Sequence, residues 1–236
     1  MKYERITIDL ERNHALVKCL ARNGAQKTKV TDLGGVMRLF KDQTETDTGD
    51  LPIIGENCIG IRRIYRRGNR GVVLVNGVNL KRDLRYDDTY KGINLPSLLM
   101  AVKFEERNGR FNILDSYLYA HENIITGDND TLYVPPFGNV YPESACRICW
   151  GSAGLRELQN LGQALGMLDL FVSSNFNQDL YRSSYARGIY DNGDLGELLQ
   201  KMQDHSATHD RFPYGEARLT RSRTYGELIN YIQNNL

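Results

Sequence analysis

Two side chains suited to acyl transfer lie ten residues apart in one loop, the amide of Asn139 and the thiol of Cys149. A thiolate that attacks a thioester or another carbonyl places negative charge on the carbonyl oxygen, and a fixed amide donor can stabilise that charge or brace the loop. Three prolines and a Gly-Asn pair in the first eight residues of the loop 135–151 fix φ or favour turns. They predict a rigid extended loop that is neither a helix nor a central strand.

The same cysteine allows other chemistry. A lone cysteine is often a small buried hydrophobe. Cys146-x-x-Cys149 also has the spacing of redox and zinc motifs, and His205-x-x-x-His209 could supply two further ligands. We interpret the sequence against both roles, because the Cys pair lies in a proline-rich loop and the His pair in a polar segment typical of a solvated loop. The sequence therefore predicts no metal site and no cofactor. It gives no indication of a papain-like Cys-His pair, and an activated thioester needs no adjacent base.

The loop resembles the active-site loop of the ubiquitin-conjugating (UBC) fold, whose signature is His-Pro-Asn-Ile, a short turn and then Ile-Cys-Leu. Phe137-Gly138-Asn139-Val140 matches the first part through its Asn, and Ile148-Cys149-Trp150 matches the second through its Cys. The His and Pro of the signature are absent, and the spacing between Asn and Cys is two residues longer than usual. Both Cys146 and Cys149 are therefore candidates for the catalytic position.

A closer resemblance is to the bacterial version of this fold called PRTRC-system protein B, which belongs to a cassette with ParB-related and ThiF-related proteins. That family has a Pro-aromatic-x-Asn loop, a turn and a Cys. It also has a later Phe-x-x-Ser-x-Phe motif, which here spans Phe171 to Phe176. The Thr-His that follows in the family is Asn177-Gln178 in this chain. The resemblance covers about residues 50–220.

The resemblance implies a carrier that accepts the C-terminus of a ubiquitin-like protein on Cys149 from a ThiF-type activating enzyme and passes it to an amine. Asn139 would stabilise the oxyanion or the loop. The residues that would form the binding wall are Phe137, Val140, Tyr141 and Trp150. The alternative is a catalytically inactive UBC-like scaffold or binding module of a plasmid-borne bacterial cassette. Loss of the His and Pro of the signature favours this alternative, whereas retention of the Asn and Cys favours the enzyme.

Of the two loop cysteines, we expect Cys149 to be the acceptor, because the reactive Cys of the signature follows an apolar residue, as in Ile148-Cys149. Cys146 lies nearer the turn, so we expect it to be more exposed and its thiolate to be favoured by Arg147. Exposure alone does not make an acceptor. A thioester also needs a wall that excludes water and a donor within hydrogen-bond reach.

Composition limits the partners and the compartment. The 236 residues suffice for one large domain, and a net charge of +1 gives no field that would recruit nucleic acid or an anionic membrane. The basic run Arg62–Arg70 could contact phosphates, although a charged hairpin edge explains it as well. The chain has no apolar run of about 18 residues and no apolar N-terminal signal region, so we expect a cytoplasmic protein. Cys19 and Cys58 lie in apolar segments and are expected to be buried.

The candidate residues must be positioned by a strand-rich first half and a helix-rich second half. The expected fold is α+β and UBC-like, with an antiparallel four-stranded meander backed by helices and an N-terminal β-hairpin and helix extension. Alternating apolar residues and turn dipeptides predict the meander strands at 58–65, 71–76, 95–104 and 110–120. The segment 83–90, which is rich in Asp and Tyr, is expected to be loop surface.

The extension is expected to span residues 1–50 and the core residues 51–236, because the segment 42–50 is polar. In the extension, a hairpin would precede a short helix that Thr31 caps. After the candidate loop, apolar stripes predict three helices, at Leu155–Leu168, Leu195–Met202 and Thr224–Ile232, and a capping box opens the last of them.

Overall fold

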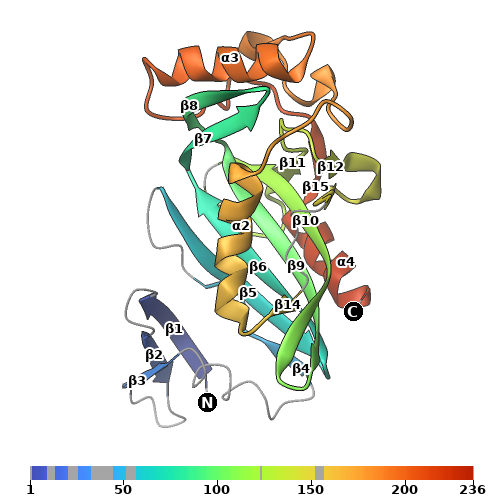
Figure 1. Cartoon of the computed structure of the whole chain (residues 1–236). Coiled ribbons are helices and arrows are strands. Elements are labelled where there is room, and N and C mark those ends of the chain that lie inside the picture. The colour runs from blue at the N-terminus through green and yellow to red at the C-terminus, as the bar shows by residue number, and fades with distance from the viewer. Residues whose placement is uncertain are drawn as a thin grey trace.

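The computed structural model describes residues 2–9, 14–20, 26–32, 45–51, 57–122, 124–151 and 157–235, with side chains from Thr46 onward. Within these ranges, a large antiparallel sheet carries the core and a separate three-stranded sheet is formed near the N-terminus (Figure 1). Three α-helices follow the main strands in the chain. The protein is thus a mixed fold with a mostly antiparallel sheet and few helices.

The main sheet runs in the order β12-β13-β10-β9-β6-β5-β4, with β11, β14 and β15 off this path, and its strand pairs are antiparallel. Its long strands are β5 (Cys58–Arg67), β6 (Arg70–Val78), β9 (Ser97–Arg107) and β10 (Arg110–His121). Its short strands are β4 (Glu45–Asp47), β11 (Thr131–Tyr133), β12 (Val140–Tyr141), β13 (Arg147–Ile148), β14 (Glu157–Leu158) and β15 (Arg221–Thr224). This sheet is larger than the four strands predicted, because short segments add to it beside β5 and β10.

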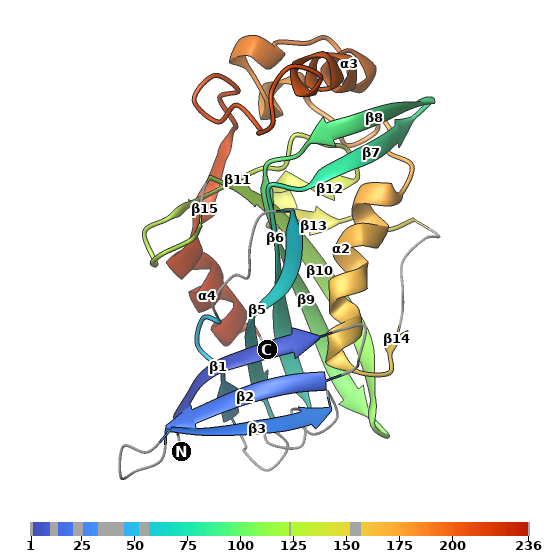
Figure 2. The ribbon, with the colours of Figure 1, turned by 90° about the vertical axis from the view of Figure 1, so that its left-hand side faces the viewer.

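Both faces of β6 and β9, the central strands of the sheet, are covered, which explains their nearly continuous apolar sequences. All but the first residue of β6 are buried. Helix α2 (Ala164–Ser173) lies on one face of the sheet and α4 (Tyr225–Asn234) on the other (Figure 2). Val72 and Leu74 face α4, whereas a Cβ atom on Gly77 would come within 2.8 Å of Leu168 in α2, as the alternation of side chains along a strand requires. Each face of β6 therefore belongs to a different helix.

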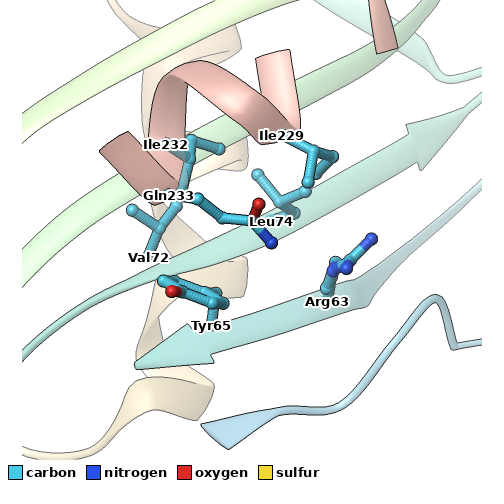
Figure 3. Close-up of a pocket in the computed structure, with 7 residues that line it drawn as sticks. All are labelled: Arg63, Tyr65, Val72, Leu74, Ile229, Ile232 and Gln233. Carbon is cyan, nitrogen blue, oxygen red and sulfur yellow. The ribbon is translucent and has the colours of Figure 1, made fainter. Parts of the chain in front are cut away.

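A small gap remains between α4 and the sheet (Figure 3). It is lined by Arg63, Tyr65, Val72, Leu74, Ile229, Ile232 and Gln233. Its volume is about 10 Å³, which leaves room for no more than one water molecule. We interpret it as an imperfection of core packing rather than as a binding site.

The helix predictions hold to different degrees. Helix α3 (Leu195–Ser206) buries the predicted apolar stripe, and α4 begins with the predicted capping box between Thr224 and Glu227. The first predicted helix starts later than expected. Leu158 lies in strand β14 and pairs with Phe111, and a 3₁₀ turn at Leu161–Gln163 precedes α2. The side chain of Asn160 caps that turn, which explains why the helical stripe does not extend further back.

A separate two-stranded hairpin lies in the chain between β6 and β9, which are neighbours in the main sheet. It consists of β7 (Lys81–Tyr86) and β8 (Asp88–Asn94), and α3 packs against it (Figure 1). The prediction of loop surface here was wrong. Asp87 provides the left-handed turn residue, and the Asp83 carboxylate accepts a hydrogen bond from the Gly92 N–H at 2.8 Å, so the acidic residues shape a hairpin.

The N-terminal sheet has the order β1-β2-β3. The predicted hairpin corresponds to β1 (Lys2–Asp9) and β2 (His14–Leu20), and a third strand, β3 (Gln26–Asp32), was not predicted. Thr31 lies in β3 and so does not begin a helix there. The remainder of the predicted helix, residues 33–40, and the side chain of Cys19 lie outside what the structure describes.

Two further predictions fail for residues of β5. Cys58 is exposed, because it is the first residue of the strand and only its C-terminal neighbours enter the core. The basic run is solvent-exposed at its tip, residues 67–70, but the part within β5 is not a free edge, since β4 pairs with the end of β5. Arg62 is buried and donates to the Asp50 carboxylate at 2.8 Å, and Arg66 pairs with Glu106 at 2.6 Å.

No helix in the described part of the chain is long and apolar enough to span a bilayer.

Candidate active site

The hairpin formed by β12 and β13 brings the candidate amide and thiol together. Val140 pairs with Ile148, and at the next position outward the Cys149 N–H donates to the Asn139 carbonyl at 2.8 Å. Asn139 and Cys149 are thus cross-strand neighbours at the open end of the hairpin. The additional residues between them lie toward its closed end, so the unusual sequence spacing does not separate the two side chains.

Because side chains alternate along a strand, this hairpin has an apolar face and a polar face. Val140 and Ile148 are buried in the core on the apolar face. The polar face carries Asn139, Tyr141, Arg147 and Cys149. The Tyr141 hydroxyl donates to Cys149 Sγ at 3.6 Å, and the Arg147 guanidinium carbon lies 5.4 Å from the centre of the Tyr141 ring. The thiol is therefore half-buried beside a phenol and a cation.

Cys146 occupies the turn of the hairpin and points into the protein. Ala145 and Cys146 both have a φ of 57°, a left-handed conformation that is uncommon for residues other than glycine. The Tyr119 hydroxyl of β10 donates to the Ala145 carbonyl at 2.6 Å and so helps to hold this turn. The Cys146 side chain is fully buried, and its Sγ lies 3.6 Å from Ser222 Oγ.

Burial raises the pKa of the Cys146 thiol to about 11. The prediction of an exposed Cys146 with a favoured thiolate is therefore wrong. Two consecutive left-handed residues turn its side chain away from solvent, and the neighbouring Arg147 lies over Tyr141 instead.

Asn139 connects the cysteine strand to the segment that follows α2. Its φ is 63°, which Asn tolerates better than most residues. Only 8% of the residue is exposed, and its Nδ2 donates to the Asn175 carbonyl at 3.0 Å. The reverse orientation of the amide would place the Asn139 Oδ1 and the Asn175 carbonyl oxygen, two acceptors, at that distance. Its Oδ1 is buried without a hydrogen-bond partner among the described residues.

Gly138 allows this close approach. A Cβ atom at this position would lie 2.2 Å from the Asn177 carbonyl oxygen, so a larger residue requires a shift of the backbone. The UBC signature has Pro here. The substitution of Gly lets the loop pack directly on the segment 175–177.

Cys149 opens onto a cavity of about 490 Å³, a size in the range of ligand pockets in proteins. Asn139, Cys149 and Trp150 form one wall. The remaining lining residues are Arg85, Gly151, Leu170, Phe171, Ser173, Ser174, Asn175 and Asn177. The cavity therefore combines one thiol, several polar groups and one cation.

A chain of four aromatic rings supports the floor of the site. The ring centroids lie 5.6 Å apart for Phe137 and Phe176, 5.4 Å for Phe176 and Phe171, and 6.0 Å for Phe171 and Trp150. Trp150 Nε1 also donates to Ser116 Oγ at 2.5 Å. These contacts fix the backbone immediately after Cys149.

The predicted wall residues take different positions. Trp150 lines the cavity and Tyr141 reaches the thiol, whereas Phe137 and Val140 are fully buried and support the loop from below. Sequence reasoning missed Arg85, because its hairpin was expected to be a loop. The lining residues that follow α2 did have a sequence signal, since the Phe-x-x-Ser-x-Phe motif spans Phe171 to Phe176.

The residues considered for zinc binding do not converge. Cys146 and Cys149 point to opposite sides of the hairpin. The His205 and His209 rings stack on each other with centroids 4.0 Å apart, and burial together with the neighbouring His209 lowers the pKa of His205. His205 belongs to the last turn of α3 rather than to a loop. Within the described ranges, no group of three or more His, Cys, Asp or Glu side chains could hold a metal ion.

One of three comparisons with known proteins identifies a family. The sequence model of prokaryotic E2 family D matches residues 76–219, a range that contains the long central strands from the end of β6 onward, the hairpin and the cavity. No curated protein and no solved structure gives a significant match. Because the matched range covers more than half of the chain, the protein belongs to prokaryotic E2 family D and is ubiquitin-conjugating-enzyme-like.

Proposed function

We propose that this protein accepts the C-terminal carboxyl group of a small ubiquitin-like protein on Cys149 as a thioester and transfers it to an amine. The observation that carries the proposal is the position of Cys149 at the 490 Å³ cavity, on the hairpin whose Asn139 and Cys149 correspond to the Asn and Cys of the UBC signature. The cavity has room for the last few residues of a protein tail but not for a folded domain. A tail that enters it would bring its carboxyl carbon to the thiol.

The partners follow from the family. E2-like proteins act with a ubiquitin-like protein and an activating enzyme. We propose that the activating enzyme is of the ThiF type and that the protein belongs to the PRTRC-system protein B group of bacterial plasmid cassettes, because the loop and the later Phe171 to Phe176 motif fit that group. We also propose that residues 1–50 are an N-terminal extension of the core, in which β1, β2 and β3 pair with one another and β4, at its end, joins the main sheet beside β5.

We assign the bracing role to Asn139. Its Nδ2 is engaged with Asn175, and its carbonyl holds the Cys149 N–H. Asn139→Gly retains the left-handed backbone and removes the amide, and should lower the free energy of unfolding by about 1 kcal/mol. An amide that acts directly on the oxyanion would instead reduce the transfer rate at least ~100-fold with little loss of stability. Urea unfolding and single-turnover transfer, measured on the same variant, separate the two roles.

The test of the function is an adduct assay. The protein is incubated with ATP, a ThiF-type enzyme and its ubiquitin-like protein, and the adduct is followed by mass spectrometry with and without a thiol reductant. Cys149→Ala should abolish a reductant-sensitive adduct, and Cys146→Ala should retain it. A second route uses a tail peptide supplied as a small-molecule thioester, which requires no activating enzyme.

The rival function is a catalytically inactive scaffold. It is favoured by Phe137 and Gly138 in place of the His and Pro of the signature. An adduct that survives Cys149→Ala would refute the assignment of Cys149 as the acceptor. The absence of any adduct by both routes would establish the scaffold in place of the carrier.

A further inference from the structure

The hydrogen-bond donors around Cys149 are not equivalent. The Asn139 amide donates to the Asn175 carbonyl, and the Trp150 indole donates to Ser116. Among the described residues, the donor directed at Cys149 Sγ is the Tyr141 hydroxyl, at 3.6 Å. The group that touches the reacting sulfur is thus a phenol, whereas the Asn139 amide is engaged with the segment after α2.

The surroundings of Tyr141 strengthen it as a donor. The Arg147 guanidinium lies over its ring, and a cation in this position makes negative charge on the phenolic oxygen less costly. The charged groups that face this pair are Arg147 and Glu143 from the hairpin and Arg85 at the cavity. The hydrogen bond to Cys149 raises the pKa of Tyr141, so the hydroxyl keeps its proton at neutral pH and remains able to donate.

We propose that Tyr141 is a catalytic residue whose hydroxyl donates a hydrogen bond to the Cys149 thiolate, both when the thiolate attacks and when it leaves. This inference rests on the proposed function. In the first step, the Cys149 thiolate attacks the carbonyl carbon of the incoming thioester, a C–S bond forms, and the thiolate of the activating enzyme departs. In the second step, an amine attacks the same carbon, loses a proton, and releases the Cys149 thiolate, which takes up a proton. A hydrogen bond to sulfur stabilises the anion in both steps.

The first test measures alkylation of Cys149 by iodoacetamide at pH 7 and pH 10, with peptide mass spectrometry to read Cys149 alone. The wild type is compared with Tyr141→Phe and with Tyr133→Phe, a control whose hydroxyl bonds Glu122 instead. All three proteins carry Cys58→Ser, because Cys58 is exposed. The protein is used as the full chain and requires no partner.

We expect the order of the two alkylation rates, that of Tyr141→Phe and that of the wild type, to reverse between pH 7 and pH 10. A lost hydrogen bond to a charged group reduces thiolate formation about tenfold, but the less stabilised thiolate is intrinsically more nucleophilic. Tyr141→Phe should therefore react about threefold more slowly at pH 7 and about threefold faster at pH 10, where free thiols are largely ionised. Tyr133→Phe should follow the wild type. Equal rates at pH 7, or slowing of the same size at both pH values, would overturn the proposal, because the second result indicates blocked access alone.

A second measurement separates this inference from the proposed function. In single-turnover transfer to a small amine, Tyr141→Phe should discharge the thioester about threefold to tenfold more slowly, because the leaving thiolate is less stable. Crossing alkylation rates in a protein that forms no adduct would refute the proposed function and leave the bond from Tyr141 to the thiolate standing. Rates that do not cross would refute the bond, whatever the adduct does.

Discussion

Cys146 and Cys149 lie three residues apart in one hairpin, but their side chains have opposite environments. Cys146 is fully buried at the turn, where its thiol meets Ser222 and burial raises its pKa to about 11. Cys149 is half-buried at the open end, with its sulfur at a cavity and next to the Tyr141 hydroxyl. The comparison shows that the accessibility of each thiol depends on the side of the hairpin to which its side chain points, and not on its neighbours in sequence.

The largest effect we expect is on thiol labelling. At pH 8, iodoacetamide should modify Cys149 at least ~100-fold faster than Cys146, since a thiol with a pKa of about 11 is ionised to only ~0.1% and this one is also covered. Peptide mass spectrometry measures both rates in one sample. Cys58, which is exposed, should react as well and serves as the internal control. Similar rates at Cys146 and Cys149 would contradict the contrast.

The next largest effect concerns Gly138, which holds the Cys149 end of the hairpin against the segment after α2. Gly138→Ala should lower the free energy of unfolding by about 2–3 kcal/mol, because its Cβ atom would overlap the Asn177 carbonyl. The matched control is Gly166→Ala in α2, where nothing lies within 4 Å, and it should raise stability by about 0.5–1 kcal/mol. Urea unfolding compares the two. A Gly138→Ala protein as stable as the wild type would show that the loop and this segment do not pack closely.

The pH dependence of stability tests the environment of Cys146. Its pKa rises from 9.0 in an ordinary setting to about 11 in the folded protein. Between these values the unfolded chain releases the proton while the native protein retains it, so the free energy of unfolding falls as pH rises, by about 2 kcal/mol in total. Unfolding curves from pH 8 to pH 11 for the wild type and Cys146→Ala should diverge by this amount, because the buried tyrosines contribute equally to both. Parallel curves would be evidence against a buried thiol.

The smallest effect we expect comes from a residue outside the hairpin, Thr224, and concerns the labelling of Cys146 relative to Cys149. Ser222 lies two residues before Thr224, which caps α4 through its bond to the Glu227 N–H. Thr224→Ala should cost about 1 kcal/mol. If the cover over Cys146 opens with this end of the fold, labelling of Cys146 should rise about fivefold while that of Cys149 stays the same. An equal rise at both cysteines would show that they are protected by a single global event.

Local patterns predicted the elements whose residues interact with near neighbours in sequence. The apolar stripe of α3 and the capping box of α4 depend on residues three and four positions apart, and both predictions are confirmed. The turn residues Asn108 and Gly109 both have positive φ between β9 and β10, as the hairpin prediction required. The β7–β8 hairpin was missed because its acidic residues were taken for loop surface, and the first helix was predicted too long because Leu158 pairs with a distant strand.

The sequence by itself determined that Asn139 and Cys149 belong to one proline-framed stretch and that Cys149 follows an apolar residue, Ile148. Only the tertiary structure decided which cysteine is accessible and what the amide does. Cys146 is covered through Tyr119 and Ser222, and Asn139 is held by Asn175. These contacts join segments that are far apart in the chain, and no local periodicity or spacing encodes contacts of that kind.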